Sequence, residues 1–593
     1  MKRTYYYIIC AICAVCGFSS CGDFLEIKSQ NEIVLEDFWK EKADVDGIVA
    51  GCYSALQADG VIRRMIIWGE GRSDNVAIGQ NIEGDLNLEN VLKESITAKN
   101  DYTTYDAFYN VINRCNTVML YAPQVAAEDP GYTQSELAAT IAEMTALRSL
   151  CYFYLIRTFR DVPYTTVAYT DDDQEMQIPA TPFYDVLDSL INDLERVKDY
   201  AVKRYPETKP MYQTGRITQD AVYAMLCEMY LWKKDYQNCV HYADLIIQSK
   251  KDQQEENRAR NGINGGRNRI TNQNENDPRF NGFPLVSDAT SSTYYGSAFA
   301  EIFGKANRDM PCQETIFELV YDDSPLANGM PANSAVGALY GNSDANQGRM
   351  APSSTVLDDV SNATYAVYAE KTKKLDARIY ENCNADNKSI CKFVHPSVYI
   401  SISVLNSSSS TSPASYGGKR ASNNNNSNWI IYRLTDIMLL KAEALAQTLQ
   451  EGSDSAVINF NEPIMAQCFN LVNAINKRSV CQTTLKDTLV ATDYKTKSQM
   501  VELIMQERQR ELMFEGKRWY DLVRYSLRDE NTQVLSQAVM KRESVNGQFV
   551  QNFFKKMDAI FWPYNNEETK VNKALVQNPA FGSGENSSYE KAN

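Results

Sequence analysis

The spacing of apolar residues along the chain predicts a mainly helical protein. Two runs between residues 217 and 249 repeat every three or four positions: Val222, Met225, Met229 and Trp232, then Tyr236, Val240, Ala243 and Ile247. Asp235 precedes the second run, where its side chain can cap a helix. Two antiparallel helices joined by so short a turn form the unit of a tetratricopeptide-type repeat.

Other segments have the same helical spacing. Residues 181–204, 433–450 and 460–477 are expected to form further helices of such pairs, with a period too irregular for an uninterrupted solenoid. The helix expected over 138–159 is apolar on all sides at 149–156, which predicts burial in a bundle. Arg148 and Arg157 in this helix must then find partners or reach the surface.

Long polar segments interrupt the helical pattern. Residues 251–282 are rich in Asn, Arg, Gln and Gly, and residues 405–428 contain Ser and Asn runs that we interpret as mobile loop segments and not as binding loops. Short apolar runs at 314–321 and 391–394 predict strands, and Trp429 begins another that is expected to be packed. Long loops on a helical scaffold are usual places for binding sites.

The N-terminus has the layout of a secretory signal peptide. Lys2 and Arg3 precede an apolar run from Tyr5 to Phe18, and small residues then lead to Cys21. A cysteine at this point marks a bacterial lipoprotein signal, so we expect cleavage after residue 20 and lipidation of Cys21. The alternative is an ordinary signal peptide in which Cys21 is incidental.

Composition narrows the possible chemistry. The chain has only 2 histidines, which argues against histidine-dependent catalysis. Carboxylates are abundant, so carboxylate-based chemistry stays open. The net charge of −15 argues against a nucleic-acid partner. No apolar stretch long enough to span a membrane follows the signal region.

The cysteines and acidic runs do not predict a metal site or a cofactor. After residue 20 no C-x-x-C pair occurs, and the aspartates at 171–173 are interpreted as a solvated turn. Cys383 and Cys391 could pair as a disulfide, whereas Cys227 and Cys239 are expected to pack inside helices.

One segment concentrates charge. Residues 507–525, ERQRELMFEGKRWYDLVRY, interleave opposite charges three apart on two expected helices that meet near Gly516. The expected local pairs are Glu507–Arg510, Arg508–Glu511, Glu515–Arg518, Arg518–Asp521 and Asp521–Arg524. An anion site would need unpaired positive charge, so we interpret the segment as a structural ion-pair network that joins two helices.

The same segment resembles the C-terminal signature of the SusD/RagB family of Bacteroidetes outer-membrane lipoproteins. Similar matches follow in the expected order, carried by CGDFLE at 21–26, ALRSLCYFYLIRTFRDVPY at 146–164, GRITQDAVYAMLCEMYLWKKDY at 215–236, YRLTDIMLLKAEAL at 432–445 and FWPYNNEETKVNKALVQNPAF at 561–581. The sequence departs from the family pattern at Arg160 and Ala580, where glycine is usual, and at Lys573, where proline is usual.

The resemblance implies a single domain over 21–593 with four tetratricopeptide-like helix pairs. We expect the helical scaffold at about 36–250 and 430–525, and a loop-rich region at about 251–430 and 526–593. It also implies a non-enzymatic, lipid-anchored protein of the outer membrane and cell surface that captures glycans. Its implied partner is a TonB-dependent transporter of the SusC type, and its signature helices serve the fold.

A glycan site needs aromatic rings beside hydrogen-bonding side chains, because sugar C–H faces stack on rings while amides, carboxylates and guanidinium groups bond the hydroxyls. Residues 68–75 supply this combination and resemble a family segment that leads into a glycan-lining loop. The expected glycan contacts are Trp68, Arg72, Asp74 and Asn75, with Tyr294, Tyr295 and Tyr340 from later loops. The alternative is a capped turn in which Trp68 belongs to the core.

Two other functions remain open at this stage. Repeat helix pairs also bind peptides, so the chain could be a protein-interaction scaffold on the cell surface. A two-carboxylate glycosidase is the third class, although the regular strand and helix alternation of a barrel is missing. The aromatic loops favour glycan binding.

Overall fold

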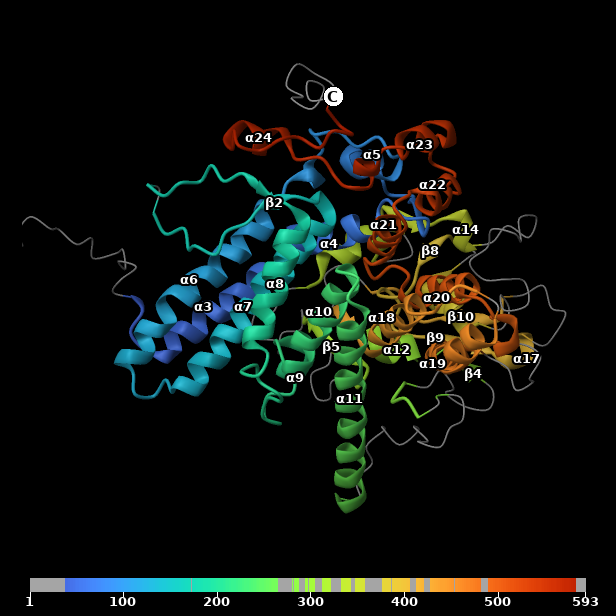
Figure 1. Ribbon diagram of the computed structural model, residues 1–593, viewed down its shortest axis with the longest axis horizontal. Coiled ribbons are helices and arrows are strands. Elements are labelled where there is room, and N and C mark those ends of the chain that lie inside the picture. The colour runs from blue at the N-terminus through green and yellow to red at the C-terminus, as the bar shows by residue number, and fades with distance from the viewer. Residues whose placement is uncertain are drawn as a thin grey trace, which may run out of the picture.

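A computed structural model describes residues 38–582 of the chain, except residues 172, 265–279, 281, 287–293, 297, 304–311, 322–331, 343–346, 358–375, 385–386, 406–411, 421–426, 453 and 481–488. The expected signal peptide and Cys21 lie outside the described residues. Figure 1 shows the long helices between residues 42 and 197 on the left, the long helix that ends at Asn264 in the middle, and most of the labelled strands on the right.

Neighbouring helices form a layered scaffold in chain order. Its members are α3 (Lys42–Leu56), α6 (Asp106–Glu128), α7 (Gln134–Phe159), α8 (Phe183–Val197), α10 (Gln219–Trp232), α11 (Tyr236–Asn264), α18 (Leu434–Gln447), α19 (Ser455–Ser479) and α20 (Lys497–Leu512). Helix α3 packs on α6, α7 on α8, α10 on α11 and α18 on α19, and α11 packs on α18. The mainly helical class with tetratricopeptide-like pairs is therefore confirmed.

Local signals set several helix boundaries. Thr133 and Glu136 form a capping box at the start of α7, and Thr496 and Gln499 do so at α20. The side chain of Asp235 accepts a hydrogen bond from the backbone amide of Asn238 at 3.1 Å, as predicted for the cap of α11. These caps satisfy amides that the first helical turn leaves unpaired.

Helix α7 is buried from Ala142 to Phe159, and its two arginines find partners inside. Arg148 bonds Asp193 at 2.7 Å, and Arg157 bonds Glu228 at 2.7 Å. Because each buried charge has a carboxylate beside it, the helix can be apolar nearly all round and still contain them.

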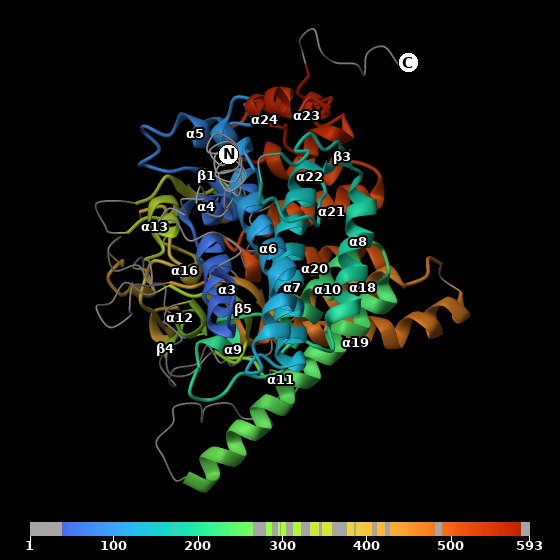
Figure 2. The ribbon, with the colours of Figure 1, turned by 90° about the vertical axis from the view of Figure 1, so that its left-hand side faces the viewer.

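Shorter elements complete the fold. The helices are α4 (Asp59–Glu70), α5 (Leu86–Leu92), η2 (Asp101–Thr103), α9 (Tyr212–Gly215), α12 (Ala298–Phe303), α13 (Ser334–Tyr340), α14 (Ser354–Leu357), α16 (Ala377–Asn382), α17 (Ile402–Leu405), η7 (Ala491–Asp493), α21 (Arg518–Asp529), α22 (Gln533–Met540), α23 (Gly547–Phe553), η8 (Met557–Ile560) and α24 (Asn566–Val571). Figures 1 and 2 place α22, α23 and α24 together with α5 at one end of the molecule.

The strands form small antiparallel sheets. They pair as β1 (Val76–Ile78) with β6 (Met350–Pro352), β2 (Val162–Pro163) with β3 (Ala180–Thr181), β5 (Thr315–Leu319) with β11 (Trp429–Arg433), β7 (Cys383–Asn384) with β8 (Ser389–Ile390), and β4 (Tyr294–Tyr295) and β10 (Ala414–Tyr416) on either side of β9 (Val398–Ser401). The predicted strand at 314–321 is thus confirmed in β5, and the packed Trp429 begins β11.

Two expectations about the loops are wrong. The polar stretch from residue 251 continues α11 to Asn264, and this helix extends away from the rest of the molecule in Figures 1 and 2. A polar helix of this kind lacks the apolar stripe on which the sequence prediction depended. Residues 391–394, expected to form a strand, follow β8 and instead contain a turn at 392–394, in which Phe393 and Val394 are buried.

Candidate functional site

The charged segment 507–525 forms the end of α20, a turn and the start of α21. Gly516 in this turn has a φ of 69°, a left-handed value that glycine adopts without strain. A Cβ atom at Gly69 of α4 would lie 1.8 Å from the carbonyl oxygen of Gly516, so the two backbones touch directly. The turn is therefore fixed against α4 in the interior.

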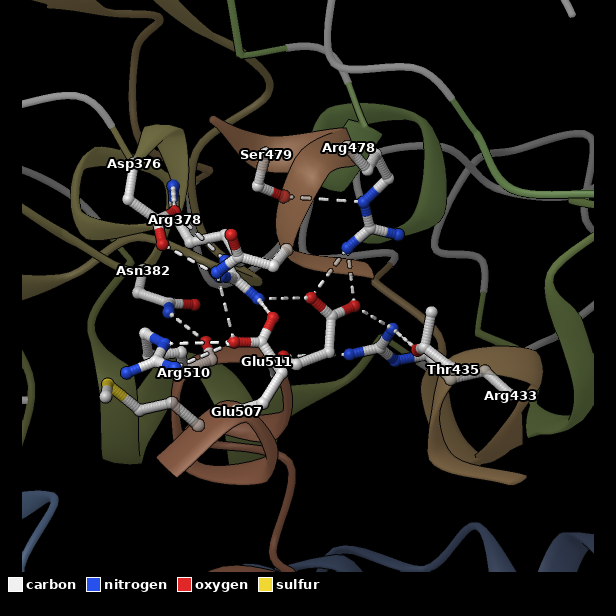
Figure 3. A network of polar contacts seen from close by, with 12 residues as sticks. Asp376, Arg378, Asn382, Arg433, Thr435, Arg478, Ser479, Glu507, Arg510 and Glu511 are labelled. Carbon is white, nitrogen blue, oxygen red and sulfur yellow. Dashed lines mark hydrogen bonds and ion pairs between the residues drawn. The ribbon is translucent and has the colours of Figure 1, made fainter. Parts of the chain in front are cut away.

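Glu511 is the centre of a buried ion-pair network, shown in Figure 3. Its carboxylate accepts from Arg378 at 3.1 Å, from Arg433 at 2.6 Å and from Arg478 at 2.5 Å. All four side chains are fully buried. The arginines come from α16, the end of β11 and α19, so one carboxylate joins three segments that are distant in sequence.

The charges of this network balance. Its cations are Arg378, Lys392, Arg433, Arg478 and Arg510, and its carboxylates are Glu314, Asp376, Glu507, Glu511 and Glu515. Five positive groups therefore face five negative ones. No unpaired positive charge is left to attract an anionic ligand, which supports the structural interpretation of the segment.

A second set of pairs ties α21 to the scaffold. Arg508 bonds Asp436 at 3.0 Å and Asp521 at 2.9 Å, and Arg524 bonds Glu443 at 2.6 Å. Both aspartates and Glu443 are buried with their partners. The network predicted to join two helices thus joins α20 and α21 to α18 as well.

Only two of the five ion pairs expected within residues 507–525 form in the structure. The Glu507–Arg510 and Asp521–Arg524 pairs form, at 2.9 and 2.8 Å. The other three expected pairs are replaced by partners from elsewhere: Arg518 bonds Asp74 at 2.8 Å, Glu515 bonds Lys392 and Arg433, and Arg508 bonds Asp436 and Asp521. Helical spacing identifies possible neighbours on one helix, but buried side chains take the partners that other elements present.

Burial alone would raise the pKa of Glu511, but Arg478, Arg433 and Arg378 together hold it well below its ordinary value. Glu70, at the end of α4, shows the opposite balance: burial raises its pKa to about 7. One of its oxygens accepts from Asn75 at 2.7 Å and from the amide of Phe514 at 2.9 Å. The other oxygen has no hydrogen-bond partner among the described residues.

The structure places the first group of expected glycan contacts in the interior. Trp68 is fully buried, donates its Nε1 hydrogen to the carbonyl of Tyr102 at 2.7 Å, and stacks on Phe108. Arg72 bonds Glu94 at 2.9 Å and lies 4.4 Å from the ring centre of Trp519. These side chains have no exposed surface to offer a sugar.

The same holds for Asp74 and Asn75 of this group and for Tyr340, which was expected in a later loop. Asp74 is occupied by Arg518, and Asn75 bonds Glu70 and Gln509. Tyr340 is fully buried and donates to the carbonyl of Phe514 at 2.9 Å. Their burial favours the alternative in which residues 68–75 form core and turn, because stacking on a sugar requires an accessible ring or polar group.

An exposed aromatic surface instead lies on the sheet formed by β4, β9 and β10. Tyr294 of β4 is 46% exposed and Tyr399 of β9 is 49% exposed. Tyr294 lies opposite Ser401, two positions along β9 from Tyr399, and Ser415 of β10 lies opposite Tyr399. Opposite residues of an antiparallel pair share a face, so these two tyrosines and two serines form one surface, here called the tyrosine face.

The other side of this sheet packs inward. Val398 and Ile400 are buried and contact Ala377 of α16. This alternation fixes the orientation of Tyr399 toward solvent, because successive side chains of a strand point to opposite sides. Tyr295 pairs with Ile400 in β4, and its side chain lies outside the described part of the chain.

Tyr399 was not among the residues chosen from the sequence. The alternating pattern of VYIS at 398–401 is the available signal, but the strand has only four residues. The two tyrosines provide apolar ring surface, and the serines provide hydroxyl groups that both donate and accept. That combination suits a neutral ligand with many hydroxyl groups.

The described residues contain no cluster of three or more His, Cys, Asp or Glu side chains arranged to hold a metal ion. Cys383 and Cys391 are both buried free thiols, so the possible disulfide does not form in this structure. Cys227 and Cys239 are buried with their sulfurs 3.7 Å apart, as expected for packed thiols. Among helices in the described part, none combines the length and apolar character that a bilayer crossing requires.

Two family models match separate parts of the chain. The model described as "SusD family" matches residues 313–581, and the model described as "Starch-binding associating with outer membrane" matches residues 23–231. A curated relative, SusD-like protein P38 of Formosa agariphila, is 24% identical over 585 residues, covering 94% of this chain and 95% of the relative.

Solved structures share the fold. A laminarin-binding SusD-like protein matches with a TM-score of 0.57 and 18% identity, covering 91% of this chain and 100% of that one. The surface glycan-binding protein A of Bacteroides thetaiotaomicron, determined with laminarihexaose, matches with a TM-score of 0.57 and 16% identity over the same shares. The two family models, both of SusD-type proteins, together match more than half of the chain, at residues 23–231 and 313–581, and on this ground the chain belongs to the SusD/RagB family.

Proposed function

We propose that this protein is a cell-surface glycan-binding lipoprotein that captures an oligosaccharide or polysaccharide and delivers it to a TonB-dependent outer-membrane transporter. Family membership supports a binding protein and not an enzyme, and two similar solved structures carry names that refer to laminarin or glycan binding. The family description also refers to association with the outer membrane.

The tyrosine face is the observation that carries the glycan part of this proposal. Tyr294 and Tyr399 occupy diagonal positions on one sheet surface, which in ordinary antiparallel sheets lie roughly 7–8 Å apart. Two rings at this spacing can contact successive parts of one extended ligand. Ser401 and Ser415 lie on the same face and can bond its hydroxyl groups.

A glycan array followed by titration calorimetry tests this site. The wild-type protein should bind one class of glycan, and Tyr294→Ala with Tyr399→Ala should weaken that binding at least tenfold, because stacked rings supply much of the contact area. Tyr200→Ala is the matched control, since Tyr200 is 61% exposed and follows α8 in the helical scaffold. Binding that is unchanged in the double variant would place the site elsewhere.

The membrane anchor is proposed at Cys21, after the charged and apolar start of the chain. Cys21→Ala should abolish labelling by a fatty-acid analogue and release the protein from the membrane fraction. Labelling that persists in this variant would refute the anchor.

Delivery to a transporter is proposed from the family alone. Pull-down from gently solubilised native membranes should recover a TonB-dependent transporter with the wild-type protein. Failure to recover it, under conditions that preserve other outer-membrane complexes, would count against delivery and leave a capture or scaffold role.

A further inference from the structure

A small pocket lies where the turn between α10 and α11 meets α18 and α21. Its charged lining residues are Lys234 from the turn, Glu443 from α18, and Arg524 and Arg528 from α21. Trp232, the last residue of α10, forms part of the wall. The pocket therefore lies at a joint between a scaffold helix pair and the signature segment.

Two buried hydrogen-bond donors at this pocket have no partner among the described residues. One is Nε1 of Trp232, a residue that is only 3% exposed. The other is Nη1 of Arg528. Arg528 uses Nε and Nη2 to hold Asp529 at 2.6 and 2.8 Å, which leaves Nη1 unused. Both groups can only donate, so an occupant that satisfies them must accept.

The charges around the pocket also favour an anion as the hydrogen-bond acceptor that occupies it. Three of its lining residues are cationic and one is a carboxylate, Glu443. Arg524 holds both oxygens of Glu443 at 2.9 and 2.6 Å and also bonds Asp521 at 2.8 Å, so Lys234 and Arg528 supply the positive charge that remains. Lys234 bonds two carbonyl oxygens of α21 at 3.4 and 3.3 Å, and in the described part of the chain it forms no ion pair. Asp529 offsets part of the charge of Arg528 from its partly exposed position.

The size of the pocket restricts what can enter. Its interior has room for about one water-sized particle, which admits a monatomic ion and excludes a bulky ligand. The walls formed by Leu231 and Leu527 are apolar, so they strengthen the interaction of a charge in the pocket with the polar groups of its lining residues.

We propose that this pocket is a chloride site in which the ion accepts hydrogen bonds from Nε1 of Trp232 and Nη1 of Arg528. The ion would join the α10–α11 pair to the C-terminal end of α21. It satisfies two donors that would otherwise be buried without a partner, a situation that destabilises a folded protein. This site is independent of glycan binding.

Thermal unfolding of the full protein tests the proposal in solution. At constant ionic strength, replacing gluconate with chloride should raise the melting temperature by about 2 °C or more, with saturation as chloride increases. Trp232→Phe keeps an aromatic ring but removes the donor, so this variant should lose the chloride-specific rise. The Arg196→Gln control should retain it, because Arg196 is 70% exposed on α8.

Bromide-soaked crystals test the position of the ion directly. An anomalous peak within hydrogen-bonding distance of Nε1 of Trp232 and Nη1 of Arg528 would support the site. A water molecule there, without anomalous signal, would overturn the proposal, as would an equal chloride-dependent rise in wild type and Trp232→Phe.

Discussion

The charged segment 507–525 and the tyrosine face differ in almost every property that suggests a ligand site. The segment has dense charge, but Glu511 and its arginine partners are buried and saturated with protein contacts. The tyrosine face has little charge, but its rings are half exposed. Binding requires accessible groups with free bonding capacity, so a high density of charge in a sequence can mark the interior of a fold.

The largest effect is expected at Glu511. Glu511→Gln removes the charge shared by three buried arginines and should lower the free energy of unfolding by about 5 kcal/mol, the upper range for a broken buried ion pair. Chemical denaturation measures this loss. Glu567→Gln is the control, because its pair with Lys570 is exposed and should contribute little.

The pH dependence of the free energy of unfolding distinguishes the contribution of the Glu511 charge from the contribution of its packing. The pKa of Glu511 is lowered in the folded protein, so its contribution to stability is present above the ordinary value of 4.5 and is lost as pH falls from there toward the lower folded pKa. The wild-type protein should therefore lose stability below about pH 4, and Glu511→Gln should lose less over that range. If stability fell equally with pH in the wild type and in Glu511→Gln, the lowered pKa of Glu511 would be contradicted.

Trp68→Ala should also destabilise the fold strongly. The ring is fully buried between Phe108 and Phe159, so truncation should cost about 3–5 kcal/mol through lost contacts and a cavity. A thermal melt checks this. A variant that melts like the wild type but loses glycan binding would restore Trp68 as a ligand contact.

Arg518→Ala breaks the buried pair with Asp74 and should cost roughly 3–5 kcal/mol. The protein that remains folded should keep its glycan affinity, since neither residue is accessible. Melting and calorimetry on the same sample distinguish the two roles. Abolished binding at an unchanged melting temperature would make the charged segment a site.

Glu70 offers a smaller, pH-specific test. Its pKa is about 7 when folded and 4.5 ordinarily, so the folded state holds its proton more tightly and stability falls as pH rises from about 4.5 to 7. Glu70→Gln cannot ionise. Between pH 5 and 8 its stability should improve relative to wild type by about 2.5 kcal/mol. Chemical denaturation of both proteins at pH 5 and pH 8 measures this change. If the difference in free energy of unfolding between the two proteins were the same at both pH values, Glu70 would not ionise in this window.

The sequence predicted the helices because their apolar spacing is long and regular. The runs before Trp232 and after Asp235 define α10 and α11 and their turn from local information alone. The extension of α11 to Asn264 could not be predicted in this way, since a polar helix has no apolar stripe.

The ion-pair partners depended on the tertiary fold. The sequence could identify charges within 507–525, but Arg378, Arg433 and Arg478 reach Glu511 from segments that only the fold brings together. The same reason applies to Trp68, which the structure places in the core. An aromatic residue beside glycine and aspartate has the composition of a sugar site and of a packed turn, and only burial distinguishes them.

The tyrosine face provides the smallest expected effect on stability and the most direct test of function. Tyr294→Ala with Tyr399→Ala should change the free energy of unfolding by no more than about 1 kcal/mol, because both side chains are half exposed. On an array that includes laminarin and starch oligosaccharides, the wild-type protein and Tyr200→Ala should bind the same glycans, and the double variant should lose them. Equal binding by all three folded proteins would contradict the separation of a buried structural network from an exposed binding face.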